Sequence, residues 1–82
     1  MKNMKKLSIY NEIIILRTEG MKKYDNIYKA VVMNLQKKYE VNTTKKGEPR
    51  MYLPDLNTLN KNEWIDLFHI HMEALDICEK SK

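Results

Sequence analysis

Residues Asn60–Glu79 read NKNEWIDLFHIHMEALDICE, and this stretch decides the fold. Asn60 followed by Glu63 is the residue pair of a capping box, so we expect a helix to begin here and to run to about Glu79. One face of this helix carries Trp64, Phe68, His71, Met72, Leu75 and Cys78, and a second set widens the apolar arc, namely Ile65, Leu67, Ile70, Ala74 and Ile77. An arc of more than about 200° predicts burial by more than one neighbour, one of which can be a second copy of the chain, as in a homodimer.

A second amphipathic helix is expected upstream, with Asp25 as its capping residue. Its apolar residues recur at spacings of three, four and seven and form one stripe: Tyr24, Ile27, Tyr28, Val31, Val32, Leu35 and Tyr39. Lys29, Gln36 and Lys37 lie on the opposite side of the helix. This pattern predicts a helix with one buried face.

The first segment allows two interpretations. The three consecutive isoleucines at 13–15 favour a strand, because β-branched side chains lose freedom in a helix. Gly20 suits the left-handed position after a helix over residues 7–19, and we favour this helix. The expected fold is therefore mainly α, a small three-helix domain. If residues 7–17 form a strand instead, the fold is α+β in the order β-α-β-β-α.

The segment between the last two helices lacks a helical period. Residues 41–44 and 49–53 contain β-forming side chains, and Gly47 lies in the turn between them. Pro49 restricts its arm to a sheet edge or a strand start. We expect either a short β-hairpin or an irregular loop here.

Length and composition favour one domain over residues 1–82, with residues 1–6 a flexible basic N-terminus and residues 80–82 a flexible C-terminus. Cys78 is the only cysteine, so no intramolecular disulfide is possible. The longest apolar run, residues 13–16, is far too short to cross a membrane, and no clean signal peptide is present. These features predict a cytoplasmic protein that does not enter the membrane.

No residue set in the sequence has the spacing of a catalytic or metal site. His69 and His71 lie about 200° apart on a helix and cannot bind one ion from the same turn. His69 and Glu73 are correctly spaced, but two ligands make no zinc site. Cys78 lies near a helix C-terminus, where the dipole disfavours a thiolate. We therefore expect no enzyme activity, no metal and no cofactor.

The favoured function is stoichiometric binding to a protein or to a protein–nucleic-acid machine. The expected anchors are aromatic and apolar side chains: Tyr52, Trp64, Phe68, Ile70, Met72 and Ile77. Thirteen of the fifteen basic residues are lysine, and asparagine and isoleucine each occur eight times, a bias typical of AT-rich genomes. An inhibitor of a host defence system, carried by a phage or mobile element, is one concrete form of this function.

The alternative is a basic regulator that binds nucleic acid. Residues 1–50 carry 12 Lys or Arg against 5 Asp or Glu, whereas residues 51–82 carry 3 against 6. Residues 12–21 resemble the first helix and turn of bacterial helix-turn-helix regulators, which implies contact with DNA. The expected phosphate contacts are Lys22, Lys23, Lys37, Lys38, Lys45, Lys46 and Arg50.

Overall fold

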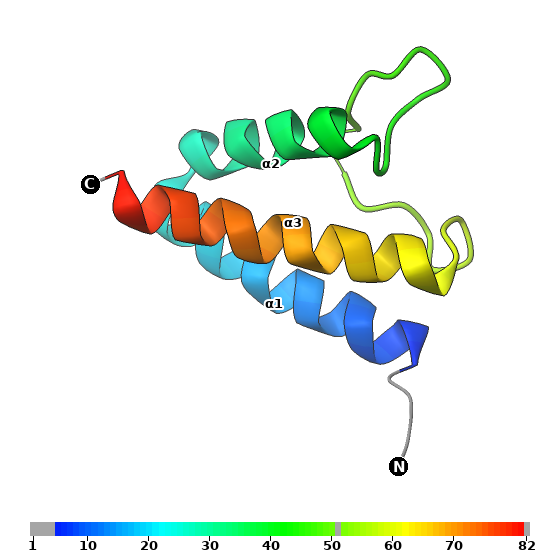
Figure 1. Ribbon diagram of the computed structural model, residues 1–82. Coiled ribbons are helices and arrows are strands. Elements are labelled where there is room, and N and C mark those ends of the chain that lie inside the picture. Colours follow the sequence, from blue (N-terminus) through cyan, green and yellow to red (C-terminus); the bar gives the residue numbers. More distant parts are fainter. Residues whose placement is uncertain (1–4, 51, 82) are drawn as a thin grey trace.

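The computed structural model describes residues 5–50 and 52–81, and three α-helices form in this range: α1 Lys6–Tyr24, α2 Asn26–Tyr39 and α3 Lys61–Lys80. In Figure 1, α1 and α2 meet at the left of the view and diverge to the right, while α3 runs between them. α3 packs against both other helices more extensively than they pack against each other. The mainly α, three-helix prediction is confirmed. The strand alternative for residues 7–17 is wrong, because all of them lie in α1.

The end of α1 differs from the prediction. The helix continues through Gly20 to Tyr24, and the chain reverses at Asp25, whose φ is 53°. Gly20 is buried against the ring of Tyr28, and a Cβ atom at residue 20 would overlap that ring. Glycine is therefore required for the close approach of α1 and α2 rather than for a turn. Asp25 precedes α2, but its side chain makes no capping hydrogen bond, which corrects that expectation.

The start of α3 is as predicted. The Asn60 Oδ1 atom accepts a hydrogen bond from the Glu63 backbone N–H at 2.9 Å, and the Glu63 Oε1 atom accepts one from the Asn60 N–H at 3.0 Å. Both halves of the capping box are therefore formed. This cap places Trp64 in the first turn of α3, where its ring is fully buried and its Nε1–H donates to the Leu56 carbonyl at 2.9 Å.

One hydrophobic core joins the three helices. Its buried residues are Ile9, Ile13, Tyr28, Val32, Leu35, Val41, Leu59, Trp64, Leu67, Ile70, Ala74 and Cys78. The predicted stripe of α2 is only partly correct, because Ile27 is 63% exposed and Tyr39 is 47% exposed. Gln36, expected on the opposite side, is buried. Its amide donates to the carbonyls of Asn42 and Arg50, and these hydrogen bonds offset the cost of its burial.

The connection from α2 to α3 forms a minimal hairpin. One isolated antiparallel bridge joins Thr43 to Pro49, and the Arg50 N–H donates to the Asn42 carbonyl at 3.0 Å. Gly47 has a φ of 83°, a left-handed conformation that glycine adopts without strain. Within residues 5–50 and 52–81, no β-ladder extends beyond this single bridge. The connection is therefore closer to the expected irregular loop than to the expected β-hairpin.

The helices extend closer to the chain ends than expected. Lys6 is the first residue of α1 and Lys80 is the last residue of α3. Residues 1–4 and 82, part of the two ends expected to be flexible, lie outside the described residues. Among the residues that are described, no helix combines the length and apolar character that crossing a bilayer requires.

Candidate functional site

Apolar side chains remain accessible where α1 and α3 run together. Leu16 of α1 and Met72 and Leu75 of α3 line a shallow hollow whose other lining residues are Asp76 and Glu79. We call these five residues the α1–α3 hollow. Met72 is 47% exposed, whereas Leu16 and Leu75 are half-buried. The hollow therefore has an apolar base and an acidic edge.

The helical period of α3 explains this arrangement. Phe68, Met72 and Leu75 are spaced by four and three residues, so they lie along one side of the helix. The fully buried residues of α3, such as Leu67 and Ala74, lie on a different side. Because the apolar arc of α3 is wider than α1 and α2 can cover, part of it stays at the surface.

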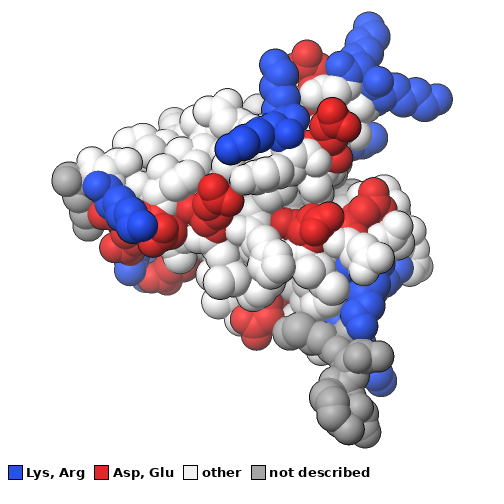
Figure 2. All heavy atoms as spheres, viewed as in Figure 1, with Lys and Arg blue, Asp and Glu red and all other residues white. Residues whose placement is uncertain are grey.

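The charge of α3 is mostly negative. α3 carries Glu63, Asp66, Glu73, Asp76 and Glu79 against Lys61 and Lys80, and Asp76 and Glu79 line the hollow. Figure 2 shows carboxylates spread along α3 on the viewed face, with uncharged surface between them. Asp76 pairs with Lys80 at 3.2 Å, but both side chains are more than half exposed. An ion pair this exposed is strongly screened by water and salt, so the acidic edge remains open to a partner.

The six predicted anchors for a protein partner do not form one surface. Trp64 and Ile70 are 0% and 2% exposed, so in the folded chain neither can contact a partner. Trp64 packs edge-to-face against Tyr10, with 5.1 Å between ring centroids. This corrects the expectation for these two residues, because a helix face with this many large apolar side chains supplies the core first.

The other four anchors are divided between two places. Met72 is exposed and Phe68 and Ile77 are half-buried on α3, whereas Tyr52 lies in the connection between α2 and α3 and is 59% exposed. Sequence reasoning missed Leu16 and Leu75. The signal for Leu16 was the run of four apolar residues at 13–16, which spans about 300° of a helix, so that not all four can be buried.

The predicted nucleic-acid contacts are also divided. Lys37, Lys45 and Lys46 line one polar hollow at the end of α2, together with Glu40 and Thr43, Thr44 and Gly47. Lys22 and Lys23 lie in the last turn of α1, at the opposite end of α2 (Figure 1). Lys23 pairs with Glu19 at 3.0 Å. The structure therefore brings three of the seven predicted residues together.

Lys38 and Arg50 have other neighbours. The Lys38 ammonium lies 5.2 Å from the centroid of the Tyr39 ring, and the Arg50 Nη1 donates to the Tyr52 hydroxyl at 3.4 Å. The turn expected at Gly20 does not form, because Gly20 is inside α1. The resemblance to a helix-turn-helix unit therefore lacks its turn.

The titratable side chains of α3 have different environments. His71 is buried, and burial together with the Arg17 charge lowers its pKa to about 4. Burial also raises the pKa of the Cys78 thiol, which keeps it protonated at neutral pH. His69 is exposed beside the Phe68 ring. Within residues 5–50 and 52–81, no three His, Cys, Asp or Glu side chains gather in a way that would hold a metal ion.

Comparisons of the chain with protein-family models, curated proteins and solved structures produced no match.

Proposed function

We propose that this protein is a non-enzymatic binding protein that acts stoichiometrically on a protein partner through the α1–α3 hollow. The observation that carries the proposal is the exposure of Met72 above the half-buried side chains of Leu16 and Leu75. An apolar base with a polar rim is the usual composition of a protein interface. The flexible thioether of Met72 adapts to an uneven surface, which suits a protein-binding site.

The edge of the hollow defines the chemistry of the partner. Asp76 and Glu79 line it directly. A complementary surface presents an apolar side chain flanked by lysine or arginine. Proteins that bind nucleic acid carry such basic surfaces. We therefore propose a nucleic-acid-binding protein as the partner, and blocking of a host defence enzyme as the biological form of this activity.

The test compares two apolar positions that are both exposed. Tagged wild-type protein, Met72→Glu and Ile27→Glu are used to capture proteins from a nuclease-treated lysate of an AT-rich bacterium, with quantitative mass spectrometry as the readout. Ile27 is the matched control, because it is 63% exposed and lies on α2, away from the hollow. We expect one protein at near-equal stoichiometry with the wild type and Ile27→Glu. Its recovery with Met72→Glu is expected to fall by at least about tenfold, as for the loss of a central interface residue.

A charge reversal separates the acidic edge from the apolar base. Asp76→Lys is expected to weaken capture of the same protein, whereas Glu48→Lys, an exposed position in the hairpin, is expected to leave it unchanged. Equal recovery of every captured protein by Met72→Glu and the wild type would contradict the proposal.

A second candidate function is binding of nucleic-acid phosphates by the hairpin. It is favoured by one observation, the convergence of Lys37, Lys45 and Lys46 around one polar hollow. In the same experiment it predicts that capture disappears on nuclease treatment and that Met72→Glu behaves as the wild type. The acidic residues Glu40 and Glu48 close to these lysines weaken this candidate relative to the first.

A further inference from the structure

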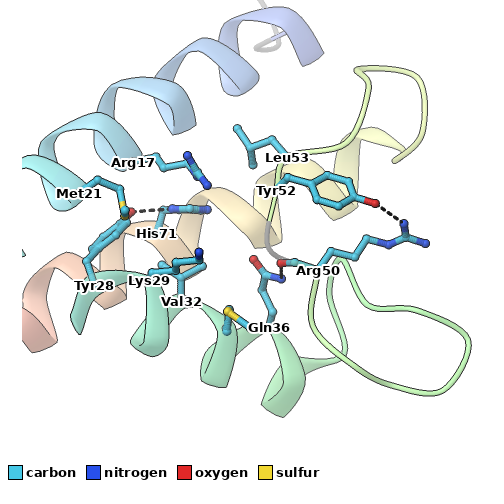
Figure 3. Close-up of a pocket in the computed structure, with 11 residues that line it drawn as sticks. Arg17, Met21, Tyr28, Lys29, Val32, Gln36, Arg50, Tyr52, Leu53 and His71 are labelled. Carbon is cyan, nitrogen blue, oxygen red and sulfur yellow. Dashed lines mark hydrogen bonds between the residues drawn. The ribbon is translucent and has the colours of Figure 1, made fainter. Parts of the chain in front are cut away.

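A second concave site lies between α1 and α2, floored by α3. Arg17 of α1 and Lys29 of α2 line this cleft, and Arg50, after the hairpin, lines it too but directs its guanidinium toward the Tyr52 hydroxyl (Figure 3). All three are half-buried. None of the 11 described residues that line the cleft is an Asp or Glu. Cations gathered in a cleft with low-dielectric walls focus a positive potential on the space between them.

His71 forms the floor of the cleft and is only 1% exposed. Its Nδ1 atom shares a 2.6 Å hydrogen bond with the Tyr28 hydroxyl. At the other end of the ring, the buried Nε2 atom has no hydrogen-bond partner among the described residues. Figure 3 shows the ring extending from Tyr28 toward the space beneath Arg17. A buried polar atom left without a partner is costly, and most such atoms in proteins are satisfied.

The direction of the Tyr28–His71 hydrogen bond decides whether Nε2 is a donor. Burial and the Arg17 charge lower the pKa of His71 to about 4, so the ring carries one proton at neutral pH. When the Tyr28 hydroxyl donates to Nδ1, that proton is on Nε2. Nε2–H then presents a hydrogen-bond donor to the cleft that Arg17 and Lys29 line.

The segment that forms one wall of the cleft, at Arg50 and Tyr52, is held in place by buried hydrogen bonds. The Gln36 amide donates to the Arg50 carbonyl at 3.0 Å, and the Asn42 amide donates to the Tyr52 carbonyl at 3.1 Å. Both Gln36 and Asn42 are buried, so the backbone at Arg50 and Tyr52 is anchored against α2. This wall of the cleft is therefore preorganised.

We propose that this cleft binds a phosphate group, one oxygen of which accepts a hydrogen bond from His71 Nε2 while Arg17 and Lys29 neutralise its charge. The free space is about 20 Å³, which accommodates one water-sized group. One phosphate oxygen reaches the floor, and the others lie toward the open side of the cleft. Two cations balance the charge of a phosphate dianion, and a guanidinium group is well suited to phosphate. The proposal is independent of the function assigned to the α1–α3 hollow.

The test is an NMR titration of the full-length protein labelled with ¹⁵N. Sodium phosphate is added at pH 7, with sodium chloride at equal ionic strength as the reference. We expect saturable shifts of the His71 ring nitrogen signals. Arg17→Gln and Lys29→Gln each remove one cation from a half-buried position and are expected to weaken binding by about tenfold. Circular dichroism shows whether each variant keeps its helices. Because two separate variants are used, the test can still be read if one of them does not fold.

The matched control removes two positive charges outside the cleft. Lys61→Gln combined with Lys80→Gln, at the two ends of α3, is expected to leave phosphate binding unchanged. A parallel titration with adenosine monophosphate distinguishes the source of the phosphate. If adenosine monophosphate binds more tightly than inorganic phosphate, the site is assigned to a phosphate on a larger molecule. If the two bind equally, the site is assigned to the free ion. Both results support the site. Linear, unsaturated shifts, or equal losses in the control and the cleft variants, would overturn it.

Discussion

The α1–α3 hollow and the His71 cleft are both lined by α3, yet they have opposite chemistry. The hollow is apolar with carboxylates at its edge, whereas the cleft has two cations, Arg17 and Lys29, beside a buried, neutral histidine. The acidic groups come from α3 itself, and the cations come from α1 and α2. α3 therefore lies between two surfaces of opposite charge, because different neighbouring segments line each surface together with α3. Perturbing the two sides separately tests whether they act independently.

The largest expected effect concerns the cleft side and depends on pH. The pKa of His71 is lowered to about 4 in the folded protein, against about 6.5 when unfolded, so the unfolded chain binds more protons between these values. The stabilising contribution of neutral His71 is fully present above about pH 6.5 and is lost as the pH falls toward 4, by at most about 3 kcal/mol. Urea unfolding at a series of pH values measures this change.

The control for this prediction is the other histidine of α3. His71→Gln is expected to flatten the stability profile between pH 4 and 6.5, whereas His69→Gln, at an exposed position, is expected to preserve it. A profile that keeps its slope in His71→Gln would show that another group is responsible.

The next effect concerns the contact between Gly20 of α1 and the ring of Tyr28, a residue that lines the cleft. Gly20→Ala adds a Cβ atom that overlaps the buried Tyr28 ring, so the α1–α2 contact must open. We expect a loss of about 1–3 kcal/mol in the free energy of unfolding, reduced in part by the better helix propensity of alanine. Because Tyr28 is hydrogen-bonded to His71, the His71 ring signals are expected to shift as well.

Gly47→Ala serves as the comparison for Gly20→Ala. A Cβ atom at Gly47 meets nothing within 4 Å, but its φ of 83° disfavours alanine. The cost is expected to be about 1 kcal/mol, with no change in the His71 signals. Equal His71 shifts in both variants would contradict the assignment of Gly20 to the packing of Tyr28.

The smallest expected effect on stability is on the hollow side. Asp76→Asn removes the carboxylate that pairs with Lys80, and both side chains are largely exposed. The free energy of unfolding is expected to change by less than about 0.5 kcal/mol, as measured by thermal or urea unfolding. A larger loss would mean that the acidic edge stabilises the fold and is not simply available to a partner.

Self-association through α3 stays a prediction, and its structural basis is narrower than the apolar pattern of α3 suggested. The over-wide apolar arc of α3 led us to expect a second chain, but α1 and α2 cover most of that arc within one chain. The part left at the surface, the α1–α3 hollow, is edged by Asp76 and Glu79. A second copy would place like charges together there, which disfavours a symmetric dimer through this surface.

Much of the fold followed from local signals. The capping box of Asn60 and Glu63 located the start of α3, and the apolar spacing of Tyr28, Val32 and Leu35 located the buried side of α2. Gly20 misled the prediction because its role depends on Tyr28, which lies eight residues away on another helix. Gln36 was expected on the exposed side of α2 but is buried, because its hydrogen-bond acceptors belong to the hairpin and not to α2.

The amino-acid sequence by itself determined that this chain forms helices, where the last one starts and how its charge divides between the two halves, because helix caps, spacing and composition are local properties. Only the tertiary structure decided which apolar side chains of α3 are core and which remain at the surface, because that depends on how much of the arc α1 and α2 cover. It also decided that Arg17, Lys29, Arg50 and His71 share one cleft. These residues are far apart in the chain, and no local rule reports their meeting.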